Sequence, residues 1–193
     1  VFDRLAPAWA ENTWATAGQD QRRHVDWGAE TAAPHGGARA QRITVDRIVP
    51  GGGTILFQNF DFVGGRVYEG RVWLRAAAPM KVRVLFRKRS FYYNTGAAWV
   101  ANVGPAWQEV VIRGGYARDM PGQFLVQPAE PGMLFVDDAS LKEVTADVLR
   151  RPPLGQEPVP RAFFGMHVNK LGTHNPWPPL RFGTLRLWDT ATH

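Results

Sequence analysis

The residues from Gly65 to Ala76, GRVYEGRVWLRA, alternate between two kinds of side chain. Tyr68, Val72 and Leu74 share one parity and are large and apolar. The positions between them hold three charged groups and one large ring, namely Glu69, Arg71, Trp73 and Arg75. Successive side chains of a strand point to opposite faces, so this period of two predicts a central β-strand. The apolar face must lie against a core, and the polar face is free for another role.

Other segments of the chain have the same short alternation and are separated by Gly and Pro turns. We expect strands at residues 38–48, 54–63, 81–87, 107–112, 123–127 and 133–141. Residues 1–33 are irregular, with one or two short strands among Trp9, Trp14 and Trp27. No helical period continues for three turns. The pattern therefore predicts an all-β fold, an antiparallel β-sandwich, and a hydrophobic content of 45% is enough for its core.

The composition changes near Arg150, where the run RRPPLGQEPVPR holds four prolines and no apolar period. Such a run predicts an extended, semi-rigid linker. Beyond it, FFGMHVN at 163–169 and GTLRLWD at 183–189 indicate two more strands. Two strands do not form an independent domain. We therefore expect a sandwich over 1–146, a linker over 147–162 and the first part of a second domain over 163–193.

Charge and cysteine content limit the classes of partner. The chain has 23 basic and 17 acidic side chains and a net charge of +6, which favours acidic partners such as nucleic acid or anionic polysaccharide. No basic run is longer than the one at 87–89 and no nucleic-acid motif is present, so we predict no nucleic-acid partner. Without cysteine there is neither a disulfide nor a thiolate metal site. No apolar run is long enough for a transmembrane segment.

Flat rings beside planar hydrogen-bonding groups suit a sugar, because the ring stacks on the sugar and the polar groups meet its hydroxyls. Trp73 and Arg75 form such a pair. Arg83 and Arg87 on the neighbouring predicted strand are expected to share that face with the amides of Asn59 and Gln127. A predicted loop carries the rings of Tyr92, Tyr93 and Trp99. The predicted contacts are Trp73, Arg75, Asn59, Arg83, Arg87, Tyr92, Tyr93, Trp99 and Gln127. The alternatives are a solvated outer face and rings packed over the sandwich rim. Trp107 is interpreted as core.

Several of these features together resemble a known family. Gly65 before Tyr68, the run VWLRA at 72–76, Trp107 at the start of a strand and FVDDASL at 135–141 are similar to the jelly-roll carbohydrate-binding modules of the family 4/9/16/22 type. The resemblance covers residues 1–146 and implies binding of a polysaccharide or oligosaccharide. Modules of this shape also occur without sugar binding, so the alternative is a structural or protein-interaction sandwich.

Asp137 shares its parity with Ala139 and Leu141, which predicts that its carboxylate points inward. A buried carboxylate needs a partner or a cation. The resemblance implies a structural Ca²⁺ near this position, with Asp3 and the backbone around Gly37 completing the oxygen shell. The alternative is a carboxylate that accepts hydrogen bonds from backbone N–H groups.

The C-terminal part resembles another family. FFGMHVNKL, followed by WPPLRFGTLRLWDT, is similar to the opening strands of family 39-like glycoside hydrolases, including bacterial enzymes that cut biofilm exopolysaccharide. Strand ends at one face of such (β/α)8 barrels carry the active site. The resemblance places His167 and Asn169 at the end of the first barrel strand, and puts at the end of the second strand Arg186, Trp188 and Asp189.

That second resemblance sets an expectation about catalysis. Retaining glycosidases need two carboxylates about 5 Å apart. In this clan they come from the fourth and seventh barrel strands, and this chain holds only two strands of that kind. We therefore expect it to be catalytically incomplete and to belong to a larger exopolysaccharide-degrading enzyme that is secreted or periplasmic. Its partners are expected to be the polysaccharide and the rest of the barrel or another protein.

Overall fold

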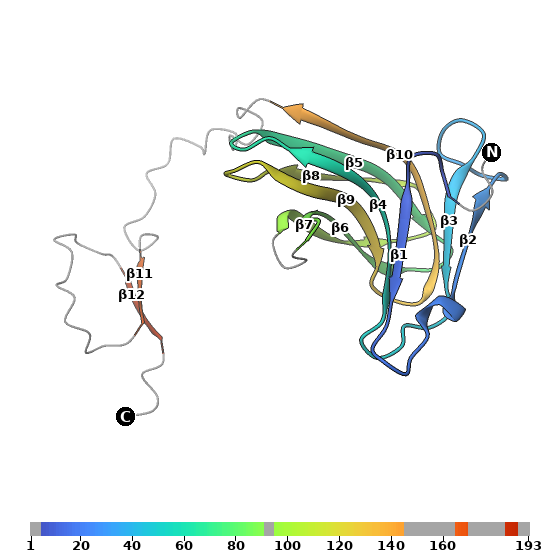
Figure 1. Cartoon of the computed structure of the whole chain (residues 1–193), viewed down its shortest axis with the longest axis horizontal. Coiled ribbons are helices and arrows are strands. Elements are labelled where there is room, and N and C mark those ends of the chain that lie inside the picture. Colours follow the sequence, from blue (N-terminus) through green and yellow to red (C-terminus); the bar gives the residue numbers. More distant parts are fainter. Residues whose placement is uncertain (1–4, 91–94, 145–164, 170–183, 189–193) are drawn as a thin grey trace. The chain divides into compact units, whose positions relative to one another are not determined.

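A computed structural model describes residues 5–90, 95–144, 165–169 and 184–188 (Figure 1). The chain divides into two compact units, Val1–Leu149 and Arg150–His193. Each unit is described here by itself. No helix in the described ranges is long and apolar enough to cross a membrane.

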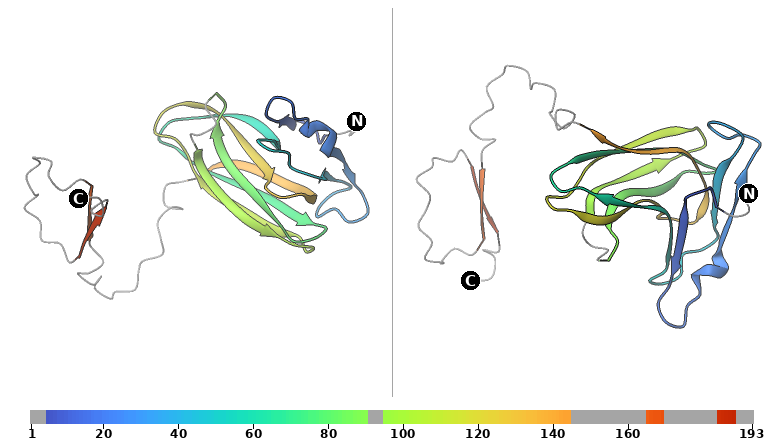
Figure 2. Two further views of the ribbon diagram at one scale, coloured as in Figure 1. Left: turned by 90° about the horizontal axis from the view of Figure 1, so that it is seen from below. Right: turned by 45° about the horizontal axis from the view of Figure 1, so that its top comes forward.

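The first unit is a sandwich of two five-stranded antiparallel sheets, as predicted (Figures 1 and 2). Sheet A contains, in spatial order, β1 (Ala10–Trp14), β4 (Gly53–Phe62), β9 (Met120–Pro128), β6 (Met80–Lys88) and β7 (Thr95–Val103). Sheet B contains, in spatial order, β2 (Val25–Glu30), β3 (Ala40–Val45), β10 (Gly132–Val144), β5 (Val67–Ala76) and β8 (Gln108–Gly114). One 3₁₀ turn, η1 (Gln21–His24), precedes β2.

The core fills the space between the two sheets. The predicted parity of β5 is confirmed, since Tyr68, Val72 and Leu74 are all buried in it. Phe86 of sheet A lies with its ring near Gly70 of β5, and a Cβ at that glycine would stand 2.8 Å from a ring atom. The glycine in the middle of the strand therefore makes room for an aromatic ring where the two sheets meet.

The structure corrects the expected arrangement of β5 and β6. The chain passes from sheet B to sheet A over residues 77–79, so the two strands are not neighbours in one sheet. β6 lies instead between β9 and β7. The polar side chains of β6 thus belong to the outer face of sheet A, and Trp73 belongs to the outer face of sheet B. Alternation shows which residues of a strand share a face, but it does not show which sheet receives the strand.

In the second unit, β11 (Gly165–Asn169) and β12 (Thr184–Trp188) pair in parallel. Both expected strands of the C-terminal part are therefore present. The proposed linker at 147–162 lies outside the described residues, and so does Asp189.

Candidate functional site

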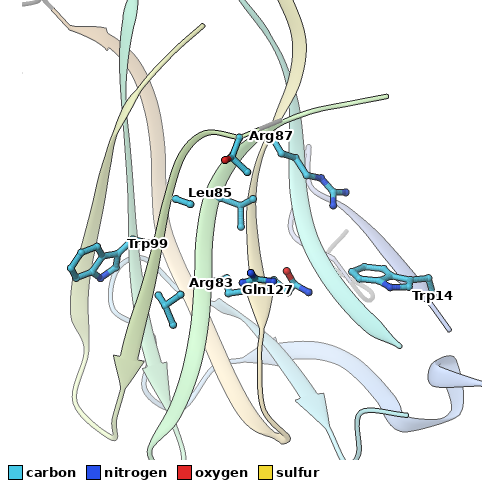
Figure 3. A pocket seen from close by; sticks show the side chains of 9 residues that line it. Trp14, Arg83, Leu85, Arg87, Trp99 and Gln127 are labelled. Carbon is cyan, nitrogen blue, oxygen red and sulfur yellow. The ribbon is translucent and has the colours of Figure 1, made fainter. Parts of the chain in front are cut away.

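A groove with a volume of about 640 Å³ crosses the outer face of sheet A (Figure 3). It is lined by Trp14, Arg83, Leu85, Arg87, Thr95, Ala98, Trp99, Val100 and Gln127. These residues come from β1, β6, β7 and β9, so the groove reaches from one edge strand of the sheet to the other. Of the large hydrophobic side chains that are exposed in the described ranges, Trp99 and Val100 both lie here, 60% and 53% exposed. Val100 pairs with Arg83, so its exposed side chain lies on the groove face of the sheet.

An apolar row of cross-strand partners lies beneath the groove, and Leu85 and Ala98 of this row line it. Leu85 pairs with Leu125 of β9 and with Ala98 of β7, and Leu125 pairs with Phe57 of β4. Leu85 and Leu125 are buried, together with Ile55, in a small cluster on this side of the sheet. Because cross-strand partners point to the same face, the row crosses four strands.

One polar row flanks this floor and is already held in place. Arg87 donates from Nε to Oε1 of Gln123 at 2.9 Å, and Nε2 of Gln123 donates to Oδ1 of Asn59 at 3.2 Å. Arg87 and Gln123 are 8% and 6% exposed. On the other side of the floor, Gln127 pairs with Arg83, whose side chain is exposed. Four of the residues predicted from sequence are thus brought together on one face.

Trp14 closes one end of the groove and was not among the predicted contacts. Its half-buried ring packs against the small cluster around Leu125. Trp14 pairs with Gly53, where a Cβ would stand 2.6 Å from a ring atom, so the indole lies close over the glycine. The pairing joins residues 39 positions apart, and no local pattern of the sequence indicates it.

Trp99 lies at the opposite end of the groove from Trp14, with Arg83, Leu85 and Gln127 between them (Figure 3). It belongs to edge strand β7, so its placement in a loop was wrong. Trp99 pairs with the core residue Val84, which directs its ring to the other face of β7 from Ala98. Tyr92 and Tyr93 lie outside the described residues.

Trp73 and Arg75 contact their own chain on the outer face of sheet B. The His35 ring stacks on Trp73 with centroids 3.8 Å apart and planes at 17°. The Arg75 guanidinium lies 4.1 Å from the Phe135 ring centroid, and its Nη2 lies 3.5 Å from a carboxylate oxygen of Glu30. A role for Trp73 and Arg75 in glycan contact stays a prediction, at a surface separate from the groove.

The interpretation of Trp107 as core was wrong. Trp107 is half-buried and precedes β8, and it has the parity of Glu109, opposite to the buried Val110. Its Nε1 donates to the carbonyl oxygen of Ala33 at 3.2 Å. The ring also lies edge-on to His35 at 5.7 Å between centroids. Trp107 therefore belongs to the outer face of sheet B, together with the connection between β2 and β3.

Asp137 also lies on this outer face, not inward as predicted. Asp137 pairs with Trp73, and Ser140 pairs with Arg71, so β10 has three steps where β5 has two. This bulge inserts one residue and reverses the alternation. A parity counted back from Leu141, which packs on the core, therefore assigns Asp137 to the wrong face.

The Asp137 carboxylate accepts hydrogen bonds from three backbone N–H groups. Oδ2 accepts from His35 at 2.9 Å and from Gly36 at 3.0 Å, and Oδ1 accepts from Asp138 at 2.9 Å. These hydrogen bonds anchor the connection between β2 and β3 to β10. They also surround the carboxylate with N–H donors, whereas a bound cation needs oxygen ligands. In the described ranges, no three His, Cys, Asp or Glu side chains gather to hold a metal. Asp3 lies outside those ranges.

Calcium binding at Asp137 and Asp3 thus stays a prediction of the sequence. If calcium is bound there, EDTA should lower the melting temperature of the protein. Calcium added at about 1 mM, a concentration in the range of extracellular sites, should restore it. The physical reason is that a ligand bound only by the folded state stabilises that state. Thermal melting at both conditions measures the effect. A melting temperature that stays the same in EDTA and in calcium rejects the metal and leaves Asp137 as a loop anchor.

No family model and no curated protein matches the sequence. Solved structures do match the fold. The CBM22-1 xylan-binding domain of Paenibacillus barcinonensis Xyn10C has a TM-score of 0.53 at 12% identity, over 75% of this chain and 90% of that one. TmCBM61 in complex with β-1,4-galactotriose has a TM-score of 0.52 at 16% identity, over 72% and 90%.

The same fold occurs in proteins with other activities. A cyclase from Fischerella sp. TAU, in complex with 4-(1H-indol-3-yl)butan-2-one, has a TM-score of 0.57 at 14% identity, over 76% of this chain and 89% of that one. This chain also matches the fold of a part of the enzymatically active domain of bacteriophage CBA120 tailspike protein 4, and the matched part makes up 20% of that chain. At such identities the likeness shows the fold alone, the jelly-roll sandwich that carbohydrate-binding modules have and that the sequence predicts for residues 1–146.

Proposed function

We propose that the groove on sheet A binds a polysaccharide or oligosaccharide. The observation that carries the proposal is the apolar floor at Leu85, which lies between Arg83 and Gln127 on one side and Arg87 on the other, with Trp14 at one end. A sugar has apolar C–H faces that pack on such a floor, and hydroxyls at its edges that meet guanidinium and amide groups. The volume of about 640 Å³ lies in the ordinary range of ligand sites.

The comparisons support the same proposal. Two solved structures with this fold are described as a xylan-binding domain and as a complex with β-1,4-galactotriose.

Two of the polar contacts proposed here, Arg87 and Asn59, are connected through Gln123, which holds both in place. Groups that are fixed in this way hold their geometry for a ligand.

We also propose that this module serves a larger glycoside hydrolase that degrades exopolysaccharide outside the cytoplasm, either secreted or in the periplasm. The support is the sequence resemblance of the C-terminal part, together with the parallel pairing of β11 and β12, which consecutive barrel strands share. In that register His167 lies opposite Arg186, and Asn169 lies opposite Trp188.

The test compares two tryptophans on opposite outer faces. Trp14→Ala is expected to weaken glycan binding by about 1 to 3 kcal/mol, because it removes the ring at the end of the groove. Trp73→Ala is the matched variant on sheet B and tests the separate prediction of glycan contact there; if the groove alone binds the glycan, this variant leaves the affinity unchanged. A glycan array with the whole chain identifies a ligand, calorimetric titration measures both variants, and thermal melting checks that each is folded.

Two other results would reject the proposed site or the proposed function. Loss of binding in the Trp73 variant, with the Trp14 variant unaffected, would place the glycan site on sheet B. If no glycan on the array binds the folded chain, the alternative of a structural or protein-interaction sandwich replaces glycan binding.

A further inference from the structure

We propose that the ligand of the groove is an acidic glycan, whose sugars carry carboxylate or sulfate groups. This inference rests on the proposed function and adds the chemical class of the ligand. It starts from the charge of the groove. Two arginines, Arg83 and Arg87, are among its lining residues, and none of the lining residues is acidic.

Two carboxylates near the ends of this outer face lie beside cations. Asp61, at one end of the outer face, lies 3.6 Å from Arg89. Glu130, beyond the other end, lies 3.7 Å from Lys81. These pairs are close to neutral, so they do not offset the positive charge of the groove between them. The net charge of +6 for the whole chain has the same sign.

The arginines of sheet B provide a comparison, because their guanidinium groups take part in contacts within the fold itself. Those on its outer face each contact a carboxylate of the chain: Arg42 contacts Asp26, Arg71 contacts Glu69 and Glu109, Arg75 contacts Glu30, and Arg113 contacts Glu69. Arg83 differs from all of them. Among the residues that the structure describes, Arg83 has no hydrogen bond or ion pair with another side chain, although it lies in a strand beside Gln127.

Arg87 adds a second and more rigid donor. The residue is 8% exposed, and its Nε donates to the amide oxygen of Gln123, which helps to fix the plane of the guanidinium at the groove. A planar guanidinium matches a carboxylate or a sulfate with two parallel hydrogen bonds, and its hydrogen bonds to anions are about twice as strong as neutral ones. A neutral sugar offers only hydroxyls to the same groups. The charge and the geometry therefore both favour an acidic ligand.

The experiment uses pairs of glycans that share one backbone. Oligomers of galacturonic, glucuronic, mannuronic and guluronic acid are titrated together with their carboxyl-reduced, neutral forms, and sulfated oligosaccharides form a third arm. The chain is expected to bind an acidic oligomer about tenfold more tightly than its neutral form, as a charged hydrogen bond of about 1.5 to 3 kcal/mol allows. The arm with the higher affinity tells carboxylate from sulfate. Added salt should reduce the preference.

Two variants separate the groove from the charge of the whole chain. Arg83→Gln is expected to weaken binding of the acidic oligomer more than binding of the neutral form, and so to remove most of the preference. Arg118→Gln removes the same charge from an exposed position outside the groove lining and is expected to change neither affinity. Thermal melting confirms that both variants fold.

Equal affinity for acidic and neutral forms, or an unchanged preference in Arg83→Gln, would overturn this inference and leave the glycan-binding proposal standing. Binding of polyglutamate as tight as that of the acidic oligomers also overturns it, since the groove would then select charge without sugar. Absence of binding to every glycan rejects the proposed function itself.

Discussion

Phe86→Ala is expected to lower the free energy of unfolding by about 3 to 5 kcal/mol. Phe86 is fully buried, and its ring lies 5.2 Å from the Phe62 ring and 5.5 Å from the Phe124 ring, measured between centroids. It faces Gly70 of the opposite sheet, which has no side chain to fill the space that alanine would leave. The cavity would therefore persist between the two sheets. Urea denaturation followed by tryptophan fluorescence measures the change.

A matched variant on the same sheet tests whether the loss comes from the core. Val100→Ala removes apolar atoms from a side chain that is 53% exposed and should change stability by less than about 0.5 kcal/mol. A loss below about 1.5 kcal/mol for Phe86→Ala would show that the sheets close over the cavity. That result would contradict the tight packing around Gly70.

Acidification is expected to remove the second large contribution to stability, that of Glu69. Its side chain is 3% exposed on the outer face of sheet B. Arg71 donates from Nε to Oε1 at 2.6 Å, and Arg113 donates from Nε to Oε2 at 2.7 Å. Hydrogen bonding to Arg71 first, and then to Arg113, lowers the pKa of the carboxyl to about 2, although burial acts in the opposite direction.

The sign of the pH dependence follows from that lowered pKa. The folded-state pKa lies below the ordinary value of 4.5, so the contribution is present above pH 4.5 and is lost as the pH falls toward 2. Its upper limit is about 3 kcal/mol, and the partial exposure of both arginines reduces it. Glu69→Gln should lose this amount at pH 7 and show a flatter profile below pH 4.5. Denaturation at a series of pH values measures both effects.

Glu143→Gln is the comparison for that profile. Glu143 lies on the neighbouring strand β10, and its side chain is 48% exposed in an ion pair with Arg66. A surface pair contributes about 0 to 1 kcal/mol, so this variant should keep the acid sensitivity of the unmodified chain. If both variants have the same pH profile, the acid sensitivity does not come from Glu69.

The sandwich could be predicted from local alternation, because burial of Tyr68 and its parity partners needs only the period of a strand. Alternation also selected the outward residues Arg83, Arg87, Asn59 and Gln127, and the structure places all four on one face of sheet A. It assigned Trp73 to that same face because the sequence does not show where the chain changes sheets. A turn of three residues decides that question through the packing of the whole unit.

Two other differences arise from contacts that are distant in sequence. The bulge in β10 reverses the direction of Asp137, and its partner strand β5 reveals the extra residue only after pairing. Trp14 enters the groove because β1 pairs with β4, and a short strand among irregular residues gives no sign of its partner. In both cases the sequence shows the type of residue, but the pairing of strands in the folded protein determines the face to which its side chain points.

The chain of hydrogen bonds from Arg87 through Gln123 to Asn59 has a consequence for the thermodynamics of binding. These side chains lose their rotamer freedom when the protein folds, so a ligand that meets them does not have to order them again. Arg83, across the floor of the groove, is exposed and keeps its freedom until a ligand arrives. Most of the side-chain conformational entropy lost on binding should therefore come from Arg83. Shortening the Arg83 side chain should change the entropy of binding more than shortening the Asn59 side chain does.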